Sequence, residues 1–118
     1  MSEMKENVII GIDLGGTGIK IGIVNAEYEI LAQTTIPTHG ERPFEQVIAD
    51  MGLAAKKLLE ESGYEVNDCL GIGVGSPGTI DSKNGVVLYS NNIRWDNVPL
   101  AEELYKYLAV PIYVNNDA

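Results

Sequence analysis

The chain has 118 residues, a formal net charge of −9 and 45% hydrophobic residues, which is typical of one soluble globular domain. The absence of a Lys/Arg cluster argues against a nucleic-acid-binding face, and no apolar run approaches the length of a membrane span. The polar start carries no secretory signal, so we expect a cytoplasmic protein without membrane partners.

The first third of the chain predicts three strands joined by short turns. Residues 8–12 form a continuous apolar run, typical of a central strand, and residues 19–25 and 29–36 predict two further strands. Turns at residues 14–18 and 25–28 separate them. Because the turns are short, the three strands are expected to form an antiparallel meander.

An amphipathic helix is expected after a polar loop at residues 37–43. Apolar side chains recur there at three- and four-residue spacing, and they are Phe44, Val47, Ile48, Met51, Ala54, Ala55 and Leu58. Gly63 is a suitable residue just past the end of this helix. His39, the only histidine, lies in the polar loop, and we expect it to be exposed and without a role.

The second half of the chain alternates strands and helices. Residues 70–75, 86–88 and 112–114 predict strands. A second helix is expected to have Pro99 in its first turn and to carry Leu100, Leu104 and Leu108 before Pro111 ends it. Cys69 cannot form an internal disulfide, because it is the only cysteine, and it is expected to be a small buried side chain.

This order of elements predicts an α/β fold. The sheet is expected to be mixed and five-stranded, with three antiparallel strands followed by parallel strands that right-handed crossovers connect. Helices flank the sheet, so the arrangement has the outline of the ribonuclease H-like fold. We expect residues 1–118 to form one domain.

The glycine-rich turn after the first strand is the first candidate site. The glycines at residues 15–18 are expected to bend the backbone through positive φ, so that backbone N–H groups form a concave anion site. Asp13, at the strand end, suits a hydrated Mg²⁺, and Lys20 suits a phosphate. The alternative is an ordinary hairpin turn, because glycine turns alone are weak evidence.

Residues 73–78 match the dinucleotide-binding pattern G-x-G-x-x-G after a strand. That motif requires a helix that begins within the loop, and no helical pattern begins there. We therefore interpret the match as a decoy. The loop remains open to two interpretations, which are a site for a polar small molecule and plain turn chemistry.

Residues 90–97 form an amide-rich segment. Asn91 and Asn92 suit sugar hydroxyls, because an amide side chain both donates and accepts hydrogen bonds. The alternative is a polar loop that a buried Trp95 anchors.

Asn116 and Asp117 follow the last predicted strand. Ligands bind beyond the carboxyl ends of strands in open α/β sheets, and Asp13 lies at such an end as well. One carboxylate can serve a metal and the other a substrate hydroxyl, which is the division that phosphoryl transfer requires. Asp117 as the N-cap of a further helix is the alternative.

Together these segments resemble the ROK family (repressors, open reading frames and kinases) of the actin-like ATPase superfamily, and among its members the bacterial glucokinases. The resemblance rests on four segments in family-like order and spacing, which are residues 13–20, 71–81, 85–100 and 110–118. Each motif alone is moderately specific, whereas the four in order are strongly specific.

The resemblance implies an actin-like ATPase domain that takes part in ATP-dependent phosphorylation of a hexose, with glucose and its 6-hydroxyl as the first choice. Asp117 would be the general base. The sugar would be bound by Asn116, Asn91 or Asn92, and the loop at Gly78 and Thr79. The phosphates of ATP would face Gly15, Gly16, Thr17 and Lys20, and Mg²⁺ would be held through water by Asp13.

Two departures from the family pattern matter. Asn115 stands where family members usually have Glu or Asp, so its role is open. The family also continues into a C-terminal domain, which carries further sugar ligands, a structural zinc site and most of the adenosine site. We therefore expect an N-terminal fragment that is inactive alone and belongs to a homo-oligomeric protein.

Two other functions compete with the kinase. One is the sugar-effector domain of a ROK-type transcriptional repressor. It is disfavoured because only seven polar residues precede the first strand, and because the phosphate motif is intact. The other is a sugar-binding module without catalysis, against which Asp117 argues.

Overall fold

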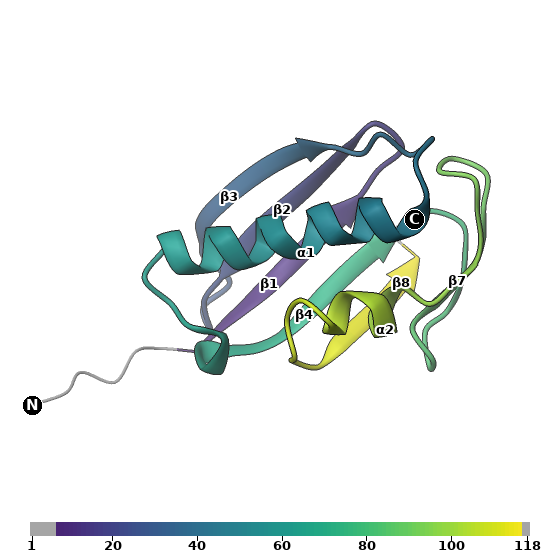
Figure 1. Cartoon of the computed structure of the whole chain (residues 1–118). Coiled ribbons are helices and arrows are strands. Elements are labelled where there is room, and N and C mark those ends of the chain that lie inside the picture. Colours follow the sequence, from purple (N-terminus) through teal and green to yellow (C-terminus); the bar gives the residue numbers. More distant parts are fainter. Residues whose placement is uncertain (1–6, 117–118) are drawn as a thin grey trace, which may run out of the picture.

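The structure, a computed structural model, describes residues 7–116. Its strands are β1 (Val8–Leu14), β2 (Gly18–Val24), β3 (Ile30–Pro37), β4 (Cys69–Ser76), β5 (Thr79–Asp81), β6 (Val86–Ser90), β7 (Trp95–Val98) and β8 (Ile112–Asn116). Its α-helices are α1 (Phe44–Glu61) and α2 (Leu100–Tyr105), and a short 3₁₀ helix, η1 (Val66–Asp68), precedes β4. Figure 1 shows these elements along the chain.

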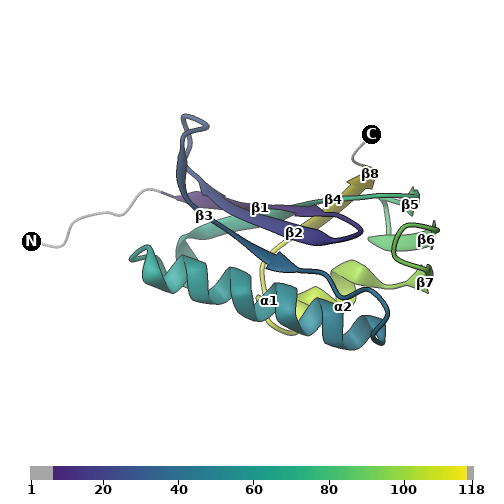
Figure 2. The same ribbon diagram turned by 90° about the horizontal axis from the view of Figure 1, so that it is seen from above.

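The main sheet has five strands in the order β3-β2-β1-β4-β8. The three strands at the N-terminus pair antiparallel, whereas β1 pairs parallel with β4 and β4 pairs parallel with β8. The predicted mixed sheet of three antiparallel strands followed by parallel strands is therefore confirmed. Both α-helices lie on one face of the sheet, as Figure 2 shows from above.

The hydrophobic core lies between this sheet face and the two helices. Alternate side chains of β1 point into it, and Val8, Ile10 and Leu14 are fully buried. The apolar stripe of α1 covers them, with Val47, Ile48 and Met51 equally buried. The opposite face of the sheet carries Ile9, Gly11 and Asp13 from β1, and no helix of residues 7–116 covers it.

The end of α1 follows the sequence prediction. Gly63 has φ +87° and follows the C-cap residue Ser62. Its N–H donates to Glu60 O at 3.0 Å, and the N–H of Tyr64 donates to Leu59 O at 3.1 Å. These paired bonds are those of a Schellman motif, which satisfies two of the last carbonyl groups of the helix.

The second helix is shorter than predicted. It ends at Tyr105, and Pro99 is its N-cap residue rather than part of its first turn. Pro111 therefore does not end it. Leu108 lies beyond the helix, yet it is fully buried beside Leu104 in the same core. The apolar spacing predicts a helix over this whole stretch, whereas in the structure tight turns after Tyr105 bring Leu108 into the core.

A second, three-stranded sheet with the order β5-β6-β7 was not predicted. Only β6 was expected, at residues 86–88. Its neighbours are short and carry exposed polar residues such as Asp96, so they lack the apolar alternation that predicts a strand. β5 and β7 are strands because they pair with β6. In one such pair, Tyr89 of β6 lies opposite Asp96 of β7.

Cys69 and His39 lie where the sequence placed them. Cys69 is 6% exposed, and burial raises the pKa of its thiol, an effect that backbone hydrogen bonds with Gly71 and Ile10 partly offset. His39 is exposed, with its Nδ1 atom 3.9 Å from a Glu41 carboxylate oxygen. None of the helices in residues 7–116 is long and apolar enough to span a membrane.

Candidate functional site

The turn between β1 and β2 is built by close backbone contacts. The N–H of Gly15 donates to the carbonyl oxygen of Gly18 at 3.0 Å. A Cβ on Gly15 would lie 2.8 Å from that oxygen, so the position requires glycine. The predicted positive φ at these glycines is wrong, because the positive-φ glycines of the described chain are Gly63, Gly78 and Gly85. Glycine is needed at position 15 because the backbone of Gly18 lies so close to it, and not because the backbone is left-handed there.

The exposed tip of this turn consists of Gly16 and Thr17. The turn therefore exposes its backbone to solvent between two strands, and unbonded backbone N–H groups in such a turn suit an anion. Asp13 and Lys20 lie just behind the tip, where they are register partners across β1 and β2 and both are exposed. They share the face of the sheet that no described helix covers.

The strand register places the end of β8 beside this turn. Asp13 pairs with Gly75 of β4, and Gly75 pairs with Asn115 of β8. Asp13 and Asn115 thus lie in one row across the sheet, separated by two strand spacings, or roughly 10 Å. This register explains how Asp13 and Asn115, which are far apart in the sequence, come to lie at the same edge of the sheet. Asp117 lies outside the described residues.

The loop after β4 joins the same edge. The side-chain amide of Asn116 donates a hydrogen bond to the carbonyl oxygen of Gly78. Gly78 has φ +100°, and Thr79 follows it, exposed, as the first residue of β5. No helix begins in this loop, so the interpretation of the G-x-G-x-x-G match as a decoy is confirmed.

The loop between β6 and β7 approaches the turn from the second sheet. Asn91 and Asn92 are both exposed there. The backbone oxygen of Asn92 lies 3.6 Å from the point that a Cβ on Gly16 would occupy. Trp95 is only 4% exposed, so the buried anchor that the alternative interpretation of this loop requires is present. The structure therefore brings Asn92 next to the phosphate-binding candidate.

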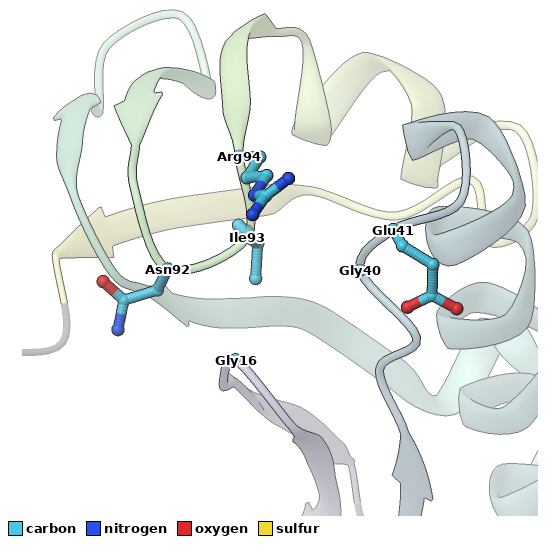
Figure 3. A pocket seen from close by; sticks show the side chains of 6 residues that line it. All are labelled: Gly16, Gly40, Glu41, Asn92, Ile93 and Arg94. Carbon is cyan, nitrogen blue, oxygen red and sulfur yellow. The ribbon is translucent and has the colours of Figure 1, made fainter.

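Gly16 and Asn92 line a cavity of about 300 Å³. Gly40, Glu41, Ile93 and Arg94 complete its lining. Figure 3 shows Arg94 and Glu41 on different sides of this cavity, whereas the side chain of Asn92 points away from both. The sequence assigned no role to residues 38–41, because a short polar loop carries no pattern that indicates which turn it will contact.

Comparisons of sequence and structure show which known proteins this chain is similar to. A model of the ROK family matches residues 9–118. Over 111 residues the chain is 40% identical to a glucokinase of Thermotoga maritima. This match covers 93% of this chain and 33% of that protein. It is also 31% identical over 110 residues to a xylose repressor of Caldicellulosiruptor bescii, covering 93% of this chain and 28% of the repressor.

Among solved structures, a ROK family glucokinase from Streptomyces griseus, in complex with glucose and AMPPNP, superposes with a TM-score of 0.81 at 31% identity. The match covers 95% of this chain and 34% of that one. The predicted actin-like ATPase fold class is thereby confirmed. The chain spans about a third of the length of the relatives it matches.

Proposed function

Because this chain belongs to the ROK family, we propose that it is the N-terminal domain of an ATP-dependent hexose kinase, with glucose as substrate and glucose 6-phosphate as product. The observation that carries the proposal is the cross-sheet row that joins Asp13 to Asn115. It brings the glycine turn and the segment preceding Asp117 to one edge of the sheet. Phosphoryl transfer needs these two parts side by side.

In this proposal the two carboxylates have different roles. Asp117 accepts the proton of the attacking sugar hydroxyl, which makes the oxygen a better nucleophile. The sugar is held on that side by Asn116, by Asn91 or Asn92, and by Gly78 and Thr79. Gly15, Gly16, Thr17 and Lys20 face the phosphates of ATP, and backbone N–H groups that the turn leaves unbonded donate to them. The bond from the γ-phosphorus to ADP breaks as the bond to the sugar oxygen forms.

The residues around Asp13 fit a hydrated magnesium ion. The Asp13 carboxylate is exposed and lies beside the turn, and it joins none of the ion pairs found among residues 7–116. Oxygen ligands and water are what Mg²⁺ prefers. When bound with ATP, the ion neutralises charge on the phosphate oxygens. From its position on β1, Asp13 would hold the ion through water.

Replacing Asp13 with asparagine is expected to raise the Mg²⁺ concentration needed for half-maximal activity about 10–100-fold, as for other residues that orient a metal from outside its direct ligands. A magnesium titration of the full-length enzyme at saturating sugar measures this. Glu45→Gln, which removes an exposed carboxylate from α1, is the matched control and should leave the titration unchanged. An unchanged titration for the Asp13 variant contradicts the assigned role.

A substrate panel on the full-length protein tests the proposed activity and the choice of sugar. Formation of ADP is measured with glucose, mannose, fructose, allose and N-acetylmannosamine. We expect the highest kcat/KM with glucose. Turnover with none of the sugars contradicts the kinase, and a higher value for another sugar contradicts glucose. The 118-residue chain alone is expected to show little or no turnover, because in this proposal one wall of the cleft belongs to the rest of the protein.

A repressor is the second candidate, because the chain is 31% identical to the xylose repressor of C. bescii. The intact phosphate-binding turn favours the kinase. A mobility-shift assay with fragments of the source genome separates the two functions. Sequence-specific DNA binding that a sugar releases, without ADP formation, would favour the repressor.

A further inference from the structure

Thr38 is a fully buried polar residue that follows the end of β3. Its hydroxyl Oγ1 donates a hydrogen bond to the carbonyl oxygen of Gly15 at 2.8 Å. Its backbone N–H donates another to the carbonyl oxygen of Thr17 at 3.0 Å. A single residue from a distant loop therefore engages two carbonyl groups of the β1–β2 turn.

These two bonds determine where the neighbouring amide hydrogens point. A trans peptide unit is planar, and its C=O and N–H point in opposite directions. Because the carbonyls of Gly15 and Thr17 are directed at Thr38, the N–H groups of Gly16 and Gly18 are directed away from it. The exposed position of Gly16 places its N–H on the solvent side of the turn.

Thr38 is itself held in place by Arg42, which an ion pair with Asp50 connects to α1. Arg42 donates from Nη2 to the carbonyl oxygen of Thr38 at 3.0 Å. From Nη1 the same guanidinium donates to a carboxylate oxygen of Asp50 at 2.8 Å. Because Asp50 lies on an 18-residue helix, these contacts link the turn to a rigid element of the fold.

We propose that Thr38 is a positioning residue, which orients the N–H groups of the β1–β2 turn toward the phosphates of ATP. This inference rests on the proposed kinase function. Thr38 does not touch the nucleotide in this account. It acts by keeping two turn carbonyls directed inward, so that the turn is already arranged for an anion before the nucleotide arrives.

The test replaces Thr38 with valine, which keeps the shape but removes the hydroxyl, in the full-length protein. The carbonyl oxygen of Gly15 then loses a buried donor, and we expect kcat/KM for Mg·ATP to fall about tenfold. The KM for the sugar should stay within about twofold of wild type, because the sugar side of the cleft is untouched. A general loss of folding would change both constants.

Two further variants make the result decisive. Thr38→Ser keeps the hydroxyl and should restore kcat/KM for Mg·ATP to within about threefold of wild type. Thr34→Val removes a half-buried hydroxyl from β3 on the α1 side of the sheet. This variant should leave kcat/KM for Mg·ATP unchanged. Wild-type kinetics in Thr38→Val, failure of the serine to rescue, or an equal loss in Thr34→Val would overturn the proposal.

Calorimetric titration with Mg·ATP, without sugar, separates this inference from the proposed activity. If the full-length protein binds Mg·ATP but phosphorylates no sugar, only the kinase proposal fails, and Thr38→Val must still weaken binding about tenfold. If the valine variant binds as tightly as wild type, the positioning role is wrong. If the wild-type protein binds no Mg·ATP at all, both proposals are wrong.

Discussion

Replacing Asp117 with asparagine in the full-length protein is expected to lower kcat for hexose phosphorylation about 10²–10⁴-fold, the usual contribution of a general base. Asparagine keeps the size and most hydrogen bonds of the side chain but cannot accept the proton of the sugar hydroxyl. The dissociation constant of the sugar, measured by titration calorimetry, should therefore stay near the wild-type value while turnover collapses.

Asn115→Ala is the matched control for Asp117→Asn, because Asn115 is exposed two positions earlier along the same segment. We expect it to change turnover far less. A kcat near wild type in the Asp117 variant would exclude this residue as the base. Equal losses of turnover and sugar binding would instead indicate that Asp117 acts in binding.

Replacing Gly78 with alanine is expected to have the largest effect on stability, lowering the free energy of unfolding by about 3 kcal/mol. The new Cβ would lie 2.1 Å from the carbonyl oxygen of Tyr89 and 2.9 Å from Cα of Ser90. Both contacts involve the backbone of β6, which cannot rotate away. A φ of +100° adds strain for any residue with a side chain.

Urea denaturation of the 118-residue chain measures the effect of Gly78→Ala. Gly73→Ala is the matched control, because Gly73 lies on β4 and a Cβ there would meet nothing within 4 Å. We expect the control to change stability by less than about 1 kcal/mol. Similar losses in the two variants would contradict the close packing of the Gly78 loop against β6.

The disturbance at Gly78 should also reach the sugar side of the cleft. The carbonyl oxygen of Gly78 accepts a hydrogen bond from the side-chain amide of Asn116, so displacement of the loop removes the support of a proposed sugar ligand. The full-length Gly78→Ala protein is therefore expected to bind sugar more weakly than Gly73→Ala.

The main sheet could be predicted from the sequence because its strands are strongly patterned. Residues 8–12 form a continuous apolar run, and the structure extends it to Leu14 as a strand with neighbours on both sides. The helix α1 was predictable for the same reason, since seven apolar positions mark its buried stripe and Gly63 ends it.

The small sheet could not be predicted, because tertiary contacts rather than local pattern create it. Thr79–Asp81 and Trp95–Val98 become strands only by pairing with β6. The sequence does not predict the end of α2 for a similar reason, because the spacing of the buried Leu108 from Leu104 matches a helical repeat. Local spacing alone does not distinguish a helical turn from a tight loop that returns to the core.

The individual motifs of the candidate site were predictable, but their arrangement was not. The glycine turn and the Asn-rich segments are visible in the sequence, whereas the meeting of Asp13 and Asn115 in one row depends on strand order. Thr38 was missed altogether, because its importance lies in two hydrogen bonds to a turn more than twenty residues earlier. No sequence pattern specifies such a contact.

In the proposed kinase, the β1–β2 turn and the segment that carries Asp117 are two parts of one phosphoryl-transfer site. Phosphorus NMR of the full-length protein with Mg·ATP and glucose tests it most directly. The account predicts that the γ-phosphoryl resonance of ATP is replaced by those of glucose 6-phosphate and ADP, and that Asp117→Asn abolishes this change. Release of inorganic phosphate alone, or an unaltered spectrum from the wild-type protein, would contradict it.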